Sequence, residues 1–255
     1  MAFDPSQFTV QKAKPLPVML LLDVSGSMSG VKIDTLNQAV RSMLETFIDE
    51  TTIETDIVVS IITFGDELKR LFPFTPAPQV RFENLSAYGG TPLGEALKMA
   101  KAIIEDRDET PSRSYRPTIV LVSDGRPGDE WRRPLEAFVS EGRSAKCDRM
   151  AMAIGADADR SVLESFIQGT SNPLFEAHRA SEILGFFKKV TMSVTMRTKA
   201  QNPNVIPVVA DVPVASASAT ATQTTPESHT MNVSLDGRTM QSVSEVPSVD
   251  DDEYF

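Results

Sequence analysis

The chain has 255 residues, a net charge of −10 at pH 7 and 41% hydrophobic residues. This length and composition suit one sizeable globular domain with additional segments, and the acidic balance argues against nucleic acid as a partner, because phosphates repel it. A single cysteine, Cys147, excludes an intramolecular disulfide and fits a reducing compartment. The apolar run 18–22 is too short for a membrane span or a secretion signal, so we expect a cytoplasmic protein without a membrane partner.

Apolar runs typical of buried strands alternate with segments whose apolar residues recur with the period of a helix. In chain order, the runs expected to be strands are 18–24, 57–65, 68–74, 118–125, 149–156 and 174–177. The segments expected to be helices are 33–49, 92–106, 131–141, 159–168 and 181–196. Strands that are apolar on both faces and alternate with helices predict an α/β fold, in which helices cover both faces of a mainly parallel sheet. Pro73 places 68–74 at the edge of that sheet.

Composition divides the chain into three parts. We expect an N-terminal extension over 1–15, the α/β domain over 16–197 and an acidic tail, rich in serine and threonine, over 198–255. Residues 201–255 contain eight acids and one arginine but few large apolar side chains. Burial therefore cannot offset the entropy lost on ordering, and the tail is expected to be disordered. Thr225 precedes a proline and is a candidate phosphorylation site in this tail.

An acid and two serines follow the first expected strand, spaced two residues apart. In the stretch DVSGSMSG, Asp23, Ser25 and Ser27 place three oxygen side chains on one loop, and its glycines let alternate residues turn toward the same point. Such a cluster is unfavourable to bury unless something binds it. A simpler interpretation is that these residues only cap turns, as aspartate and serine often do.

Two further oxygen side chains occur where the expected fold would bring them close to this loop. Thr91 stands at the expected N-cap of the helix over 92–106, and Asp124 lies at the end of the strand over 118–125. Because the carboxyl ends of parallel strands share one edge of a sheet, we expect both to lie near Asp23. Two carboxylates and three hydroxyls suit Mg²⁺, Mn²⁺ or Ca²⁺ and exclude a thiolate or imidazole site. A coordination position left open would accept the acidic side chain of a partner protein.

The stretches DVSGSMSG, YGGTPLGEAL and SDGRP resemble, in order and content, the three loops of the metal-ion-dependent adhesion site (MIDAS) of von Willebrand factor type A (VWA) domains. The resemblance implies a Rossmann-like fold with about six strands, one of them an antiparallel edge strand. It also implies a metal-dependent protein–protein interaction module whose ligands are Asp23, Ser25, Ser27, Thr91 and Asp124. The chain is similar to the TerY-type proteins of bacterial tellurium resistance and stress response, which implies a cytoplasmic adaptor or scaffold that binds a protein kinase or a PP2C-type phosphatase.

Residues beside the second and third loops are candidate contacts with the partner. Tyr88 and Gly90 lie beside the second loop, and Arg126 and Trp131 follow the third. Aromatic side chains concentrate at interface hot spots, which favours Trp131 as a contact. Trp131 is equally well explained as the anchor that holds its helix on the core.

An enzyme, in the form of a metal-dependent hydrolase or phosphatase, is the main alternative. Phosphotransferases with an aspartate nucleophile carry a second acid two residues on, where this chain has Ser25. No Walker sequence occurs, and His178 is expected at the surface or at a helix cap, so the serines lack an activating base. We therefore expect no catalytic activity. A second alternative is a kinase substrate that acts through its phosphorylated tail.

Overall fold

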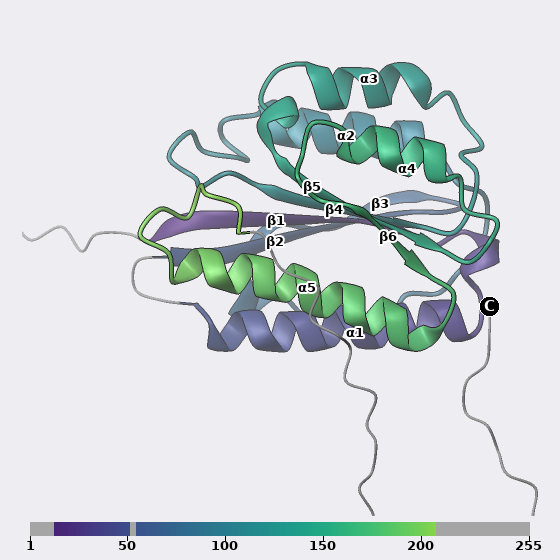
Figure 1. The fold of residues 1–255 in the computed structure, drawn as a ribbon, viewed down its shortest axis with the longest axis horizontal. Coiled ribbons are helices and arrows are strands. Elements are labelled where there is room, and N and C mark those ends of the chain that lie inside the picture. The colour runs from purple at the N-terminus through teal and green to yellow at the C-terminus, as the bar shows by residue number, and fades with distance from the viewer. Residues whose placement is uncertain (1–12, 52–54, 208–255) are drawn as a thin grey trace, which may run out of the picture.

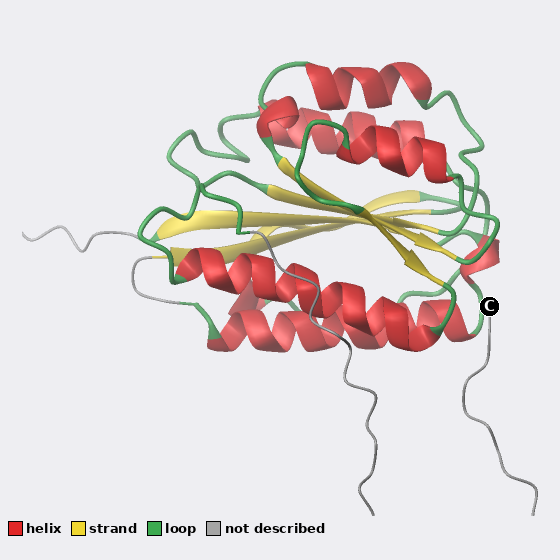
Figure 2. Ribbon diagram, in the orientation of Figure 1, coloured by secondary structure: helices red, strands yellow, loops and turns green. Residues whose placement is uncertain are grey.

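The computed structural model describes residues 13–51 and 55–207, which form one six-stranded sheet between two layers of helices (Figure 1; Figure 2). The strands are β1 (Lys14–Asp23), β2 (Thr55–Phe64), β3 (Leu68–Pro76), β4 (Thr118–Ser123), β5 (Asp148–Ile154) and β6 (Leu174–Ala177). The helices are α1 (Val31–Asp49), α2 (Leu93–Glu105), α3 (Arg132–Ser140), α4 (Arg160–Ile167) and α5 (Ala180–Thr198). None of the helices in the described residues is long and apolar enough to cross a membrane.

The sheet has the strand order β3-β2-β1-β4-β5-β6, and all neighbouring strands are parallel except β2 and β3. The predicted α/β fold, with a mainly parallel sheet and one antiparallel edge strand, is confirmed. β1 is central, because Leu20 pairs with Ile61 of β2 on one side and with Val120 of β4 on the other. After β1 the chain adds β2 and β3 on one side of it, and then crosses over to add β4, β5 and β6 on the other side. The crevice between β1 and β4 is therefore a topological switch point. In open α/β sheets, ligands bind at the carboxyl ends of the strands at such a point.

The run VMLLL in β1 is apolar throughout because helices cover both of its faces. Leu20 and Leu22 belong to the core under α1 and α5, whereas Met19 and Leu21 belong to the core under α2, α3 and α4 (Figure 1). Successive side chains of a strand point to opposite faces, so a strand that is covered twice needs no polar alternation. This double cover is why the strands could be recognised as continuous apolar runs.

β1 begins at Lys14, four residues before the expected strand, although it includes Pro15 and Pro17. A proline cannot donate a ladder hydrogen bond and is normally absent from a central strand. The carbonyl of Pro15 accepts a hydrogen bond from Tyr115 N (2.8 Å), so by alternation the missing N–H groups of both prolines face the side of β4. Pairing of β1 with β4 begins only at Val18, so no ladder bond is lost there.

The ordered contacts of the domain continue beyond residue 198, where the tail was expected to begin. Arg197 in the last turn of α5 is fully buried and donates hydrogen bonds to the carbonyl oxygens of Pro203 (2.6 Å) and Arg116 (2.5 Å). It also donates to Thr118 Oγ1 (2.8 Å), at the start of β4. The segment after α5 is therefore held at the amino end of the sheet, and the contacts that hold it could not be read from composition.

Parts of two expected segments lie outside the described residues. These are 1–12 of the N-terminal extension and 208–255 of the acidic tail. The candidate phosphorylation site Thr225 also lies there.

Replacing Arg197 by lysine should destabilise the domain although the charge is retained. An ammonium group cannot reach all three acceptors of the guanidinium, and each buried acceptor left unpaired costs about 1–3 kcal/mol. We expect the free energy of unfolding, measured by urea denaturation, to fall by at least about 2 kcal/mol. The control is Arg160→Lys, whose exposed ion pair with Glu176 contributes little. Equal loss in the two variants would contradict a special role for Arg197.

Candidate metal centre

Two buried aspartates meet at the switch point of the sheet. Asp23 is the last residue of β1, and Asp124 directly follows β4. Because β1 and β4 are parallel neighbours, their carboxyl ends lie together. The exposed fraction is 0% for Asp23 and 1% for Asp124, so neither carboxylate is hydrated as a surface acid would be. Each therefore needs protein donors or a bound cation.

The first loop turns its alternate side chains toward these carboxylates. It leaves β1 and forms the short 3₁₀ turn η2 (Gly26–Met28). Asp23 Oδ1 accepts a hydrogen bond from Ser25 N (2.8 Å), which fixes the turn. The Ser25 and Ser27 Oγ atoms are 3.1 Å apart, and Ser27 Oγ donates to Asp124 Oδ1 (2.7 Å). The predicted DxSxS cluster is thus a hydrogen-bonded unit that spans two strands.

The second loop is held against the first by its backbone. Gly26 N donates to Gly89 O (3.0 Å). Gly89 has φ +84°, and a Cβ at this position would lie 2.2 Å from Asp66 N, so only glycine fits. Tyr88 lies in the same stretch, with its N–H donating to Val24 O (2.8 Å). This packing carries the following residue pair, Gly90 and Thr91, to the edge of the site.

Thr91 is not the N-cap of α2, and the predicted capping role is wrong. Pro92 occupies that position, and no side chain at the cap bonds the helix. The N–H groups of Gly94 and Glu95 are instead bonded by the Asp129 carboxylate, at 3.0 and 2.9 Å. A carboxylate from a distant loop satisfies the helix end as well as a local threonine would. The Thr91 hydroxyl is therefore left for another use.

The third loop brings Thr91 and Ser27 to one point. A Cβ placed on Gly125 would lie 3.5 Å from Thr91 Oγ1 and 3.7 Å from Ser27 Oγ. Gly128 N also donates to Thr91 O (2.9 Å), which joins the second and third loops. All predicted ligand side chains are therefore assembled at one edge of the sheet: Asp23, Ser25, Ser27, Thr91 and Asp124. That they bind a metal remains a prediction.

Two residues of this network were missed in the sequence. Ser123 Oγ donates to Asp23 Oδ2 (2.6 Å), and Lys32 Nζ donates to Asp124 Oδ2 (2.8 Å). Ser123 could have been noticed as the only hydroxyl in the second half of an apolar strand. Lys32 stands in the first turn of α1, where a lysine is ordinarily a surface residue, so its sequence position gave no indication of this contact.

Burial dominates the electrostatics of Asp23. It raises the pKa of this carboxyl from 3.8 to about 6, although hydrogen bonds from Ser123 and Ser25 act in the opposite direction. The negative charge of Asp124 adds a smaller upward effect. The ionised form of Asp23 is thus disfavoured in the folded protein without a cation.

The expected partner contacts differ in exposure. Tyr88 is 48% exposed, and Gly90 and Arg126 are exposed as well. Trp131 is only partly exposed, packs on the core under α3, and has the Arg132 guanidinium 4.7 Å from its ring. The structure therefore gives Trp131 the anchoring role that the sequence left as an alternative.

Two other reactive side chains have ordinary surroundings. His178 is exposed, with its ring Nε2 3.5 Å from Glu176 Oε2. Its backbone N–H donates to the Glu182 carboxylate at the start of α5. Cys147 is buried, and burial raises the pKa of its thiol to about 12. Within the described part of the chain, no three His, Cys, Asp or Glu residues are grouped so that they could hold a metal. A metal centre here must use the hydroxyls.

Residues 18–126 match the family model described as von Willebrand factor type A domain. Among curated proteins, inter-alpha-trypsin inhibitor heavy chain H2 of Homo sapiens is 27% identical over 165 residues, and that of Mus musculus 26% over the same length. Each match covers 62% of this chain and 17% of the relative, so this chain corresponds to a small part of those proteins.

Solved structures share the fold at low identity. The pilus adhesin SpaC of Lactobacillus rhamnosus GG has a TM-score of 0.58 at 15% identity, over 72% of this chain and 31% of that chain. Proximal thread matrix protein 1 of the mussel byssus, with a zinc-occupied MIDAS motif, has a TM-score of 0.54 at 13% identity, over 74% of this chain and 47% of that chain. The range that matches this family model contains all the candidate ligands, and the described residues share the fold of these solved structures.

Proposed function

We propose that this chain is a metal-dependent protein-interaction module. A divalent cation, Mg²⁺ or else Mn²⁺ or Ca²⁺, would be held by Asp23, Ser25, Ser27, Thr91 and Asp124, and would bind a carboxylate of a partner protein. The observation that carries the proposal is the meeting of these oxygen side chains, from three separate loops, at the switch point of the sheet.

The donor set fits a hard divalent cation. Carboxylate and hydroxyl oxygens are the ligands that Mg²⁺ and Ca²⁺ prefer, and neither a thiol nor an imidazole lies among them. Gly125 leaves open the space beside Thr91 Oγ1 and Ser27 Oγ that a Cβ would fill. The zinc-occupied MIDAS motif of the mussel byssus protein supports a divalent cation at this place in the fold.

Two serine hydroxyls of the network donate their protons to the two carboxylates. Ser27 donates its proton to Asp124, and Ser123 donates its proton to Asp23. A hydroxyl whose proton is used in this way keeps its lone pairs for a cation. When bound, the cation would supply a positive charge that attracts a carboxylate from outside the chain.

We propose binding, not catalysis, as the role of the centre. The Ser25 and Ser27 hydroxyls bond to each other, Ser27 also bonds to Asp124, and the His178 ring faces Glu176 of β6. Cys147 stays a protonated thiol because burial raises its pKa. Neither supplies the general base that a serine nucleophile needs. Detection of metal-dependent phosphatase activity that is lost in Asp23→Ala would overturn this part of the proposal.

We place this module in a bacterial cytoplasmic stress-response complex of the tellurium-resistance kind. A protein kinase or a PP2C-type phosphatase would then be the protein that offers the carboxylate. The amino-acid sequences of the ligand loops, which resemble those of TerY-type proteins, support this proposal. The single cysteine of the chain supports a reducing compartment. Identification of the proteins captured by the chain, as described below, tests this placement.

The pH dependence of stability should report the burial of Asp23. Between its unfolded pKa of 3.8 and its folded pKa of about 6, the folded state holds a proton that the unfolded state has lost. Stability therefore falls as the pH rises, by about 2 kcal/mol between about pH 4.5 and pH 7.5. The side chain of Asp23→Asn does not titrate. The free energy of unfolding of the wild type minus that of the variant, both measured in chelator, should therefore fall by that amount as the pH rises over this range. A difference that is independent of pH would show that the Asp23 carboxyl is not perturbed.

Mg²⁺ should stabilise the folded domain by mass action. At roughly tenfold excess over its dissociation constant the gain is about 1.4 kcal/mol, measurable as a rise in melting temperature. Thr91→Ala removes a hydroxyl that caps no helix, so the fold should persist while the gain is reduced or lost. Thr46→Ala is the control, because its hydroxyl bonds Ser42 O within α1. An equal gain in both variants would place the ion elsewhere.

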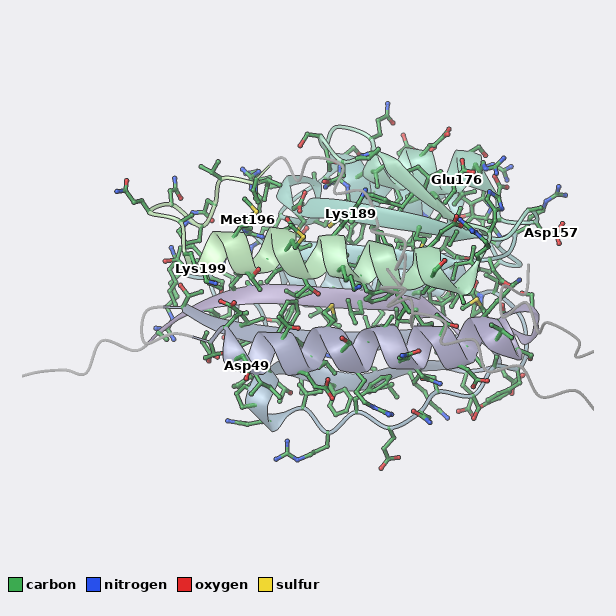
Figure 3. All side chains as sticks on the ribbon, turned by 60° about the horizontal axis from the view of Figure 1, so that its bottom comes forward. Asp49, Asp157, Glu176, Lys189, Met196 and Lys199 are labelled. Carbon is green, nitrogen blue, oxygen red and sulfur yellow. The ribbon has the colours of Figure 1, made fainter. Side chains whose placement is uncertain are left out.

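Partner binding should depend on both the cation and Asp124. We expect the immobilised chain to retain proteins from a native lysate in Mg²⁺, and to release them in chelator and in excess acetate. Asp124→Ala should retain none of them. Asp49→Ala, at the exposed far end of α1 (Figure 3), loses the same charge and should retain them all. Retention that is unchanged in chelator would refute a metal-mediated contact.

A further inference from the structure

Lys32 lies in a fixed position inside the candidate centre. Its Nζ atom is 2.8 Å from Asp124 Oδ2, and the exposed fractions of the two side chains are 19% and 0%. A Cβ on Gly155, just after β5, would lie 3.6 Å from Lys32 Nζ and 3.9 Å from Cε. The lysine side chain therefore lies along the backbone of Gly155, between α1 and the end of β5. Packing and the ion pair together hold its charge at the site.

The net charge of the centre depends on whether Lys32 is counted. Asp23 and Asp124 carry two negative charges when ionised, and the Lys32 ammonium offsets one of them. A divalent cation added to the two carboxylates alone gives a neutral centre. With Lys32 present, the same addition gives a centre with one excess positive charge. Because these groups are largely withdrawn from water, a single charge has a large effect on what binds next.

We propose that Lys32 is a specificity-determining residue that lowers the affinity of the centre for the divalent cation and raises the affinity of the loaded centre for a carboxylate. The inference rests on the proposed function and goes beyond it: the loaded centre would require an anion because Lys32 gives it an excess positive charge. The ammonium repels the incoming cation and neutralises Asp124, which weakens the first event. It leaves a positive charge that only an anionic ligand removes, which strengthens the second.

The two effects have opposite signs, and this separates the proposal from a structural role. Loss of a residue that merely supports the loops would weaken cation binding and carboxylate binding together. Loss of Lys32 should strengthen the first and weaken the second. Reciprocal linkage makes both measurable in one titration, because a carboxylate that binds the loaded centre raises the apparent affinity for the cation.

The experiment is calorimetric titration of the full chain with Mg²⁺, in chloride and in acetate of equal ionic strength. In chloride, Lys32→Gln should bind Mg²⁺ about tenfold more tightly than the wild type, the effect of roughly 1.4 kcal/mol of relieved repulsion. In acetate, the affinity of the wild type should rise, and that of Lys32→Gln should rise less or stay unchanged. Melting curves in chelator establish that each variant is folded.

Two variants serve as controls. Lys32→Arg keeps the charge and should behave as the wild type does in both salts. Lys188→Gln removes an exposed lysine of α5 and the same net charge, and should leave both affinities unchanged. Agreement of these two with the wild type attributes the effect to the charge at position 32.

The outcomes distinguish this inference from the function beneath it. If the wild type does not bind Mg²⁺, the proposed function fails and the role of Lys32 fails with it. If the wild type binds Mg²⁺ and Lys32→Gln binds it equally or less tightly, only the inference is overturned. An unfolded Lys32→Gln leaves Lys32→Arg as the test, since loss of Mg²⁺ affinity on that charge-conserving change would show that shape, not charge, matters.

Discussion

The burial of two carboxylates side by side at the carboxyl edge of the sheet is the constraint on which the rest of this structure depends. Asp23 receives a backbone N–H from Ser25 and a hydroxyl proton from Ser123, and Asp124 receives donors from Ser27 and Lys32. These four donors come from three local elements: a turn, a strand end and the first turn of a helix. The register of β1 on β4 and the start of α1 are thus tied to the same pair of charges.

The second loop is joined to the first and the third by bonds that leave the ligand side-chain oxygens uninvolved. Gly26 N bonds to Gly89 O, Gly128 N bonds to Thr91 O, and the Asp129 carboxylate holds the first turn of α2. Backbone groups and the Asp129 carboxylate, which is outside the ligand set, therefore hold the second loop and the start of α2 in place. A site built in this way is organised before any ligand arrives, and binding need not order the loops, which would weaken it.

The sequence was sufficient to predict the features that depend on hydrophobic periodicity and on parallel strands ending at the same edge of the sheet. The strands were recognised because both of their faces are apolar, and Asp23 and Asp124 could be brought together because parallel strands end at one edge. It was insufficient where a residue's role depends on a distant partner. Thr91 looked like an N-cap because the true cap, Asp129, lies 35 positions beyond Gly94. Ser123 and Lys32 escaped notice for the same reason: their acceptors, Asp23 and Asp124, lie far from them in the sequence.

Buried arginines lie at the amino end of the sheet, whereas the buried charged groups at the candidate centre are carboxylates. At the amino end, Arg149 and Arg197 direct their donors to backbone carbonyls such as Phe166 O and Pro203 O. A guanidinium has donors only, and these bonds pair them with backbone acceptors. At the carboxyl end the buried groups are carboxylates and hydroxyls, whose oxygens have more lone pairs than the donors around them can use. That surplus of acceptors is open to a cation, and the domain concentrates it where the strand order diverges.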